Sequence, residues 1–343
     1  MITRSAMAAA LVAASGLMPA LTLTLTLTLT LTLTPAPANA GAAPHRPSVR
    51  TIAAGLDNPR GLTFGPAGEL YVAEAGRGGP GPCRPGRRGG LICFGRSGAI
   101  TAIIGGRQRR ILRNLPSMAL NSGAEAIGPS DVSAGQDGEL YYTVSMTGLF
   151  RAEQTAGQAA EQTAGQAAGQ GTGQGTGQGE IAYGEAYGKR ESDLTALLVS
   201  GRTHLVVDAA AGALLRLGPR GRMFTVAAFR EPASVARGPD GALYVGDRTR
   251  IWRAEPGRTP RVYASGFTGI VDLTWSDAGG LYVLESSGTL RGAAGRTVVA
   301  RNLTAPGGLA IRGRYAYVSV CGVCSGTGAV VRVDLGAERQ PET

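Results

Sequence analysis

Histidine and lysine are almost absent from this chain: its 343 residues include two histidines, His45 and His204, and a single lysine, Lys189. Reactions that require a histidine base near neutral pH are therefore short of a candidate residue, which argues against sugar dehydrogenase, lyase and paraoxonase-like chemistry. The chain also has no nucleophile elbow, phosphate-binding loop or metalloprotease motif. These absences favour a protein that binds a partner over one that catalyses a reaction.

Charged residues are scarce as well, at 17% of the chain, yet the net charge is +10 because arginine supplies nearly all of the cations. A positive field favours anionic partners. The arginines are dispersed, and no compact basic run with interleaved aromatic residues indicates a nucleic-acid surface. The sequence predicts a monomer that binds an unidentified small molecule or an anionic extracellular polymer, and no nucleic acid.

Residues 1–40 have the pattern of a secretory signal peptide. Arg4 precedes an apolar stretch, seven Leu-Thr dipeptides follow over residues 21–34, and Ala38, Asn39 and Ala40 form a small-x-small cleavage site. A retained membrane anchor is the alternative, but threonine at every second position of the dipeptide run weakens a spanning helix. We predict cleavage after residue 40, secretion, flexible tails over residues 41–47 and 337–343, and no transmembrane segment in the mature chain.

Glycine and proline are abundant, with 54 and 19 residues, which indicates many turns and few long helices. One unit recurs between the turns: a turn, a short strand, a glycine turn, and then Leu-Tyr-Val followed by an acid. The first copy runs from Pro59 to Glu74, and the fourth runs from Pro232 to Asp247. The six copies begin at Pro59, Pro129, Asp193, Pro232, Ile270 and Pro306.

The spacing of the copies predicts the fold. Pro232 and Ile270 are 38 residues apart, and Ile270 and Pro306 are 36 apart, which matches a four-stranded propeller blade of ~40 residues. We therefore predict an all-β, six-bladed β-propeller over residues 48–336, with four antiparallel strands per blade. Val49–Leu56 is a strand left over before the first copy, and we expect it to pair with residues 330–335 and close the ring.

Residues 153–179 interrupt the second copy. This segment is rich in Gln, Gly and Ala, and it has no aromatic residue and no β-branched residue except threonine. It cannot bury enough apolar surface to become ordered, so we expect a disordered insertion in blade 2.

Four cysteines suit an exported protein, in which an even count indicates disulfides. Four cysteines allow three connectivities, and we predict the two local pairs, Cys83–Cys93 and Cys321–Cys324. A zinc site with four thiolates is the rival, but the nine residues between Cys83 and Cys93 are wrong for a zinc knuckle.

Five stretches carry a resemblance to a known family: residues 55–62, residues 68–74, the loop between Cys83 and Cys93, the Gly-Arg-Gln-Arg-Arg block at 106–110, and residues 326–333. They resemble the ScyD/ScyE family of secreted bacterial propellers, named for its association with scytonemin pigment gene clusters. The resemblance covers nearly all of the mature chain. It implies a propeller and export, but no settled reaction. The Tyr-Val-acid repeat alone is shared with NHL-type and gluconolactonase-like propellers.

Ligands of propellers usually meet the central channel at the face where innermost strands begin and second strands end. The residues that lie two positions after the six starts are Gly61, Asp131, Thr195, Ser234, Asp272 and Gly308. Four of the second strands end in an acid: Glu74, Asp208, Asp247 and Glu285. Converging carboxylates would suit Ca²⁺, with Asp131, Asp272 and Glu74 as its candidate ligands. The favoured alternative is that each recurrent acid accepts backbone N–H bonds from the next turn of its own blade.

The most concentrated positive surface comes from the cysteine loop and the strand after it. Its arginines are Arg77, Arg84, Arg87, Arg88, Arg109 and Arg110, a candidate anion-docking surface; a solvated rim is the alternative. Together these features predict a non-catalytic, exported binding or scaffold propeller with no assigned cofactor. The alternative is a Ca²⁺-dependent lactonase-like hydrolase, which needs only carboxylates, amides and Ca²⁺.

Overall fold

The computed structural model describes residues 48–86, 89–152, 178–183, 192–294 and 297–336. All of the described residues belong to one compact unit, His45–Thr343. The predicted signal peptide, the two predicted tails, His45, Arg87, Arg88 and residues 153–177 lie outside the described residues.

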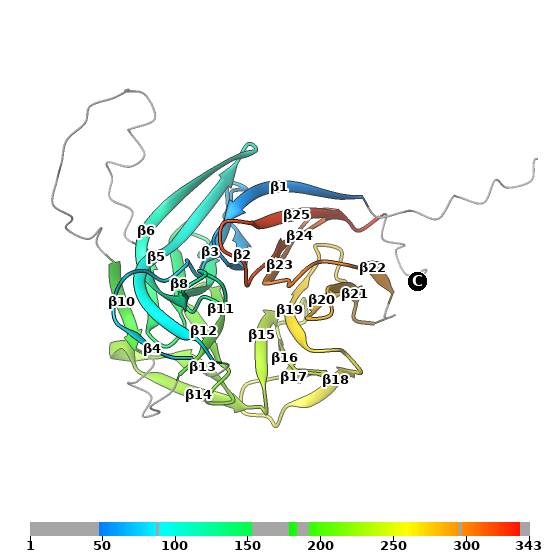
Figure 1. Cartoon of the computed structure of the whole chain (residues 1–343). Helices are drawn as coiled ribbons and strands as arrows, with labels where there is room; N and C mark the ends of the chain where they lie inside the picture. Colours follow the sequence, from blue (N-terminus) through cyan, green and yellow to red (C-terminus); the bar gives the residue numbers. More distant parts are fainter. Residues whose placement is uncertain (1–47, 87–88, 153–177, 184–191, 295–296, 337–343) are drawn as a thin grey trace, which may run out of the picture. The chain divides into compact units, whose positions relative to one another are not determined.

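Six antiparallel sheets form a ring of blades, which confirms the predicted six-bladed, all-β propeller (Figure 1). Blade 1 holds β2 (Pro59–Phe64), β3 (Leu70–Glu74), β5 (Leu91–Ile104) and β6 (Arg107–Leu120), with β4 (Cys83–Pro85) added beside β5. Blade 2 holds β7 (Pro129–Ala134), β8 (Leu140–Val144), β9 (Gly148–Ala152) and β10 (Gln178–Tyr183). Blade 3 holds β11 (Leu194–Ser200), β12 (Thr203–Asp208), β13 (Ala213–Leu217) and β14 (Met223–Ala228).

The second half of the ring repeats the same order. Blade 4 holds β15 (Pro232–Arg237), β16 (Leu243–Asp247), β17 (Arg250–Ala254) and β18 (Arg261–Ser265). Blade 5 holds β19 (Ile270–Trp275), β20 (Leu281–Glu285), β21 (Thr289–Gly292) and β22 (Val298–Ala300). Blade 6 holds β23 (Gly308–Arg312), β24 (Tyr315–Val320), β25 (Gly328–Asp334) and β1 (Val49–Leu56). The helical content of the described part is one short 3₁₀ turn, η2 (Pro219–Gly221).

The ring closes as the sequence predicts. The N-terminal strand β1 pairs antiparallel with β25 of the last copy, with Val49 opposite Val333 and Leu56 opposite Gly328. This pairing joins the start of the propeller to its end, and it covers a strand edge that would otherwise be free to pair with another chain.

The core lies between the blades. Ile100 and Leu115 of blade 1 pack with Leu140 and Tyr142 of blade 2 in one buried cluster, and every other pair of neighbouring blades shares a cluster of the same kind. Each blade is therefore buried on both faces, which explains why its strands carry continuous runs such as Leu-Tyr-Val instead of a strict alternation of apolar and polar residues.

A register shift follows the first residue of the innermost strand in blades 1 to 5. In blade 4 it separates Pro232, opposite Asp247, from Ser234. Such bulges re-aim the next side chain, here that of the residue two past the start. In blade 3 the shift lies between Leu194 and Ala196, so this copy starts at Leu194 and not at the predicted Asp193.

The predicted insertion is also slightly too long. β10 includes Gln178 and Gly179, which lie opposite Ala152 and Arg151 of β9. Backbone pairing with β9 therefore incorporates the last two residues of the predicted segment 153–179, although their composition gives no sign of a strand. Separately, no helix in the described part of the chain has the length and apolar character needed to cross a bilayer.

Candidate functional site

The innermost strands bring six equivalent residues, two past each start, to the centre of the ring. We call them the channel-centre residues: Gly61, Asp131, Ala196, Ser234, Asp272 and Gly308. Ala196 replaces the predicted Thr195 because blade 3 starts one residue later. Thr195 instead donates its hydroxyl to the carbonyl oxygen of Ala233, at 3.2 Å, in blade 4.

The polar channel-centre side chains form hydrogen bonds to the next blade. Asp131 Oδ2 accepts a hydrogen bond from the backbone N–H of Leu197 at 2.7 Å, and Asp272 Oδ2 accepts one from Leu309 at 2.7 Å. Ser234 Oγ donates to Asp272 Oδ1 at 2.5 Å. These carboxylates therefore link neighbouring blades by hydrogen bonds.

Asp131 and Asp272 nevertheless form an unusual electrostatic pair. Both residues are only partly exposed to solvent, and their carboxylates are surrounded by protein atoms. Burial, reinforced by the charge of Asp272, raises the pKa of Asp131 well above its ordinary value. Burial also raises the pKa of Asp272 to about 6, against the opposing hydrogen bonds from Ser234, Leu309 and Leu273.

This pair predicts a specific pH dependence. The pKa of Asp272 in the folded state lies above its unfolded value of about 3.9, so its contribution to stability is fully present below about pH 4 and is lost as the pH rises through about 6. The free energy of unfolding of the native chain, measured in urea and compared with that of Asp272→Asn, should rise by on the order of 2 kcal/mol from pH 7 to pH 4.5. A difference that is flat or falls on acidification would contradict the assignment.

Glu74, the third predicted Ca²⁺ ligand, belongs to a different network. Its carboxylate accepts hydrogen bonds from Arg110 Nη2 at 2.6 Å and Nε at 2.9 Å, and from Thr101 Oγ1 at 2.5 Å. Arg110 Nη2 also bonds Asp57 Oδ2 at 2.9 Å. The hydrogen bond to Glu74 is the main reason why the pKa of Arg110 is raised. Glu74 therefore does not join Asp131 and Asp272.

The other acids at the ends of second strands also serve their own blades. Asp208, Asp247 and Glu285 accept a backbone N–H from Asp193, Glu231 and Thr268, respectively, at 3.1, 2.8 and 2.7 Å. Glu74 does the same with the N–H of Asp57 at 2.8 Å. The predicted backbone role is thus present, but the donor lies just before the innermost strand of the same blade instead of in the next turn. Only Asp208 adds a bond to the following turn, from Ala211 N at 2.9 Å, among these four acids.

Ca²⁺ requires six to eight oxygen ligands. Within the described ranges, no group of three or more His, Cys, Asp or Glu side chains is placed to hold a metal ion. The predicted three-carboxylate set is not assembled, because Arg110 holds Glu74 elsewhere. Binding of Ca²⁺ by the Asp131–Asp272 pair remains a prediction.

Sequence reasoning missed Arg60, which lies beside the channel-centre residue Gly61. Arg60 Nη2 donates to the carbonyl oxygen of Ala126 at 3.0 Å. Burial lowers the pKa of Arg60, and the charge of Asp193 opposes this effect. One signal could have revealed it: the equivalent residues of the other copies, which include Ser130 and Ala233, are uncharged.

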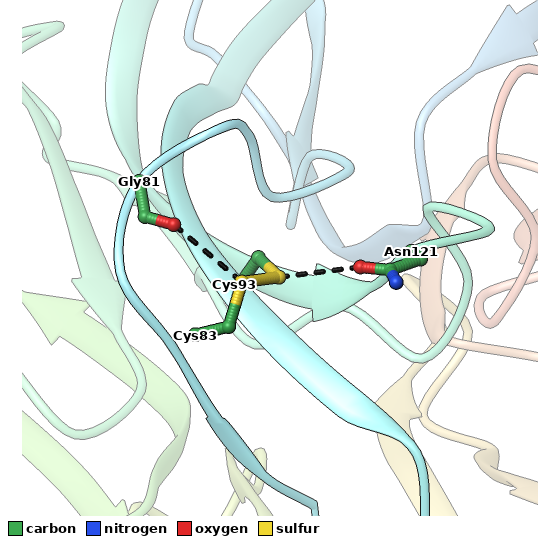
Figure 2. Close-up of a disulfide and its surroundings, with 4 residues drawn as sticks. All are labelled: Gly81, Cys83, Cys93 and Asn121. Atoms are coloured by element: carbon green, nitrogen blue, oxygen red, sulfur yellow. Dashed lines mark hydrogen bonds between the residues drawn. A yellow bond between two sulfur atoms is a disulfide. The ribbon is translucent and has the colours of Figure 1, made fainter.

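Both predicted disulfides are present, Cys83–Cys93 and Cys321–Cys324. Figure 2 shows the first of them between β4 and β5, with the carbonyl oxygen of Gly81 at 3.5 Å from Cys83 Sγ and the side chain of Asn121 at 3.2 Å from Cys93 Sγ. A disulfide sulfur carries no hydrogen and a carbonyl oxygen has none to donate, so the approach of Gly81 O to Cys83 Sγ is a close contact and not a hydrogen bond.

Asn58 directly precedes β2, at the face where the innermost strands begin. Asn58 Nδ2 donates to the carbonyl oxygens of Gly76 and Gly123 at 2.7 and 2.8 Å, and Asn58 N donates to Cys324 O at 2.9 Å. Asn58 thereby ties blade 1 to the second disulfide turn in blade 6.

The predicted arginine surface is divided. Arg84 lies opposite Ile92 near the start of β5, whereas Arg109 lies opposite Ala102, ten residues further along the same strand and roughly 30 Å away. Arg77 and Arg84 are exposed near the disulfide loop, but Arg110 is half-buried in its ion pairs with Glu74 and Asp57. Arg87 and Arg88 lie outside the described residues.

His204 lies in β12, opposite Val199 at the far end of blade 3 from the channel-face acid Asp208. Its ring packs edge-on against Tyr141, with 4.4 Å between the ring centroids. Burial lowers the pKa of His204. These contacts place it in the packing between blades 2 and 3.

No protein-family model matches this chain, and no curated protein matches it. Solved structures do. A gluconolactonase from Xanthomonas campestris has 12% identity and a TM-score of 0.58, covering 83% of this chain and 89% of that one. Regucalcin, a calcium-binding protein from Agrobacterium tumefaciens, has 15% identity and a TM-score of 0.52, covering 84% and 95%.

The PQQ-bound aldose sugar dehydrogenase from Streptomyces coelicolor has 12% identity and a TM-score of 0.54, covering 85% of this chain and 99% of that one. At such low identity these similarities establish the fold alone, since one propeller scaffold carries many unrelated functions. The resemblance to the ScyD/ScyE family stays a prediction.

Proposed function

We propose that the chain is a non-catalytic, exported propeller that binds a small molecule or an anionic extracellular polymer. One observation carries the proposal: the acids at the channel face are already engaged by the chain itself. Glu74, Asp208, Asp247 and Glu285 each accept a backbone N–H from their own blade, and Glu74 and Glu285 also pair with Arg110 and Arg291. A catalytic base needs lone pairs directed at substrate, which such saturation removes.

Two further observations support the proposal. Both disulfides fit an oxidising, extracellular compartment. Arg77, Arg84 and Arg109 are exposed and able to meet an anionic polymer, although they lie in two separate places instead of forming one patch. We also propose that the chain is a monomer and belongs to the ScyD/ScyE family.

The Asp131–Asp272 pair favours a second candidate function, a Ca²⁺-dependent lactonase-like hydrolase. Burial and mutual repulsion raise the pKa of Asp131, and a divalent cation beside both carboxylates would relieve this repulsion. The two aspartates and Ser234 would hold such an ion, which would polarise a lactone carbonyl.

One experiment separates the two candidates. The purified mature chain is incubated with a panel of aldono- and alkyl lactones in CaCl₂ and in EDTA, and its Tm is measured in both. The binding proposal expects hydrolysis no faster than the uncatalysed rate and the same Tm in both. Two results together would establish the hydrolase instead. EDTA would abolish turnover and CaCl₂ would restore it, and the Asp272→Asn variant would lose turnover whereas the variant of an exposed residue, Asp277→Asn, would keep it.

A further inference from the structure

A cleft of about 740 Å³ opens between blades 3 and 4. It is bounded by the end of β14 and the residues before β15 on one side, and by the turn between β16 and β17 on the other. None of the channel-centre residues lines it. Its volume lies within the range of about 300–1,000 Å³ that is typical of small-molecule sites.

An aromatic pair forms one wall of this cleft. The rings of Phe229 and Trp252 lie 6.3 Å apart between centroids and are tilted by 58°. Both side chains are half-buried, so each keeps surface toward the cleft. Trp252 Nε1 donates to Asp247 Oδ2 at 3.1 Å, and this carboxylate is held in turn by the backbone N–H of Glu231 at 2.8 Å. The indole is therefore fixed in orientation before any ligand arrives.

The charges around the aromatic wall do not cancel. Arg248 Nη1 binds both carboxylate oxygens of Glu231, at 2.9 and 2.7 Å, and Asp247 is occupied by the indole and by backbone N–H groups. The lining of the cleft holds three arginines and two acids, a net charge of +1, and the two arginines outside these contacts, Arg230 and Arg250, are exposed. Neither guanidinium has a hydrogen-bond or ion-pair partner in the part of the chain that the structure describes.

We propose that this cleft binds a small aromatic anion, a planar ring bearing a carboxylate or a comparable acidic group. The ring would stack on Trp252 and Phe229, and the anionic group would be bound by Arg230 and Arg250. Guanidinium groups suit this role because they present planar, paired donors to a carboxylate and remain charged at any physiological pH. This assignment rests on the proposed function, that the chain is a binding protein, and it names the ligand class and the site.

The cleft supplies its own reporter. The chain has two tryptophans, so Trp275→Phe leaves Trp252 as the only source of indole fluorescence. In that background we expect 1-naphthoate to quench the fluorescence saturably, at about millimolar concentration or lower. Two comparison compounds separate the parts of the site: 1-naphthalenemethanol has the ring without the charge, and cyclohexanecarboxylate has the charge without the aromatic ring. Each should bind roughly tenfold or more weakly than 1-naphthoate.

Matched variants locate the site. The double variant Arg230→Gln, Arg250→Gln should weaken 1-naphthoate binding, measured by calorimetry, by roughly tenfold or more. The double variant Arg202→Gln, Arg222→Gln removes the same charge from exposed arginines outside the cleft and should leave the affinity unchanged. Trp252→Leu should also weaken binding, whereas Phe224→Leu, on the exposed part of β14, should not.

Several outcomes would overturn the assignment. The absence of saturable 1-naphthoate binding would do so, as would equal losses in the cleft and control variants, or equal affinity for the three compounds. These failures differ from failure of the proposed function, which would appear as Ca²⁺-dependent lactone turnover. The cleft would still be tested independently in that case, because it shares no residue with the Asp131–Asp272 pair.

Discussion

Gly61→Ala is expected to lower the free energy of unfolding by about 3 kcal/mol or more. A Cβ at this position would lie 1.9 Å from Asp131 Oδ1, 2.6 Å from its Cγ and 3.0 Å from its Cα. The aspartate cannot simply swing aside, because its two oxygens accept hydrogen bonds from Val132 N and Leu197 N. Alanine would therefore force apart the innermost strands of blades 1 and 2. Guanidinium unfolding followed by far-UV circular dichroism measures the effect.

Gly292→Ala is the matched control. Gly292 ends β21, has no heavy atom within 4 Å of its Cβ position and does not adopt a positive φ, so alanine should change stability by less than about 0.5 kcal/mol. Gly61 likewise has no positive φ, so backbone strain does not enter the comparison. Equal stabilities of the two variants would show that the ring centre is looser than these distances indicate.

Arg110→Met should also destabilise the chain strongly, by about 3 kcal/mol. Arg110 pairs with both Glu74 and Asp57, whose side chains are 0% and 5% exposed. Methionine keeps much of the length and apolar contact of arginine but leaves two neighbouring buried carboxylates without a counter-charge. The loss would be measured as a lower midpoint of urea unfolding and a lower Tm.

The adjacent residue provides the control for that substitution. Arg109 lies on the same strand, is exposed and faces the solvent side of β6, so Arg109→Met should change stability by less than about 0.5 kcal/mol. A comparable loss in both variants would mean that net charge, and not the buried pairing with Glu74, sets the effect. Thr101→Val tests the same network from another side, because Thr101 Oγ1 donates to Glu74 Oε1.

These predictions concern residues whose importance the repeat alone did not reveal. The sequence drew attention to Glu74 as an acid at the end of a second strand, and it placed Arg110 in a docking surface. The structure joins them because the hairpin of β5 and β6 lays Arg110 opposite Thr101, close to the end of β3. Arg110, which the sequence assigned to a docking surface, is therefore a structural counter-ion in the folded chain.

The sequence by itself determined the architecture. A copy every 36 to 38 residues in the second half of the chain can only bury its apolar strands by stacking against the next copy, so blade number, strand content and ring closure all followed from local patterns. The local disulfides followed for a similar reason, since Cys83 and Cys93, like Cys321 and Cys324, are close in the chain.

Only the tertiary structure decided which side chains meet. Asp131 and Asp272 lie 141 positions apart yet share the ring centre, whereas Glu74, an acid at the end of a second strand, is held by Arg110. The cleft arose in the same way, from residues of two blades that no single copy contains. Repeat patterns report what each blade needs for its own packing, but contacts between blades depend on register shifts of one residue, and a shift of that size is invisible in a copy as divergent as the third.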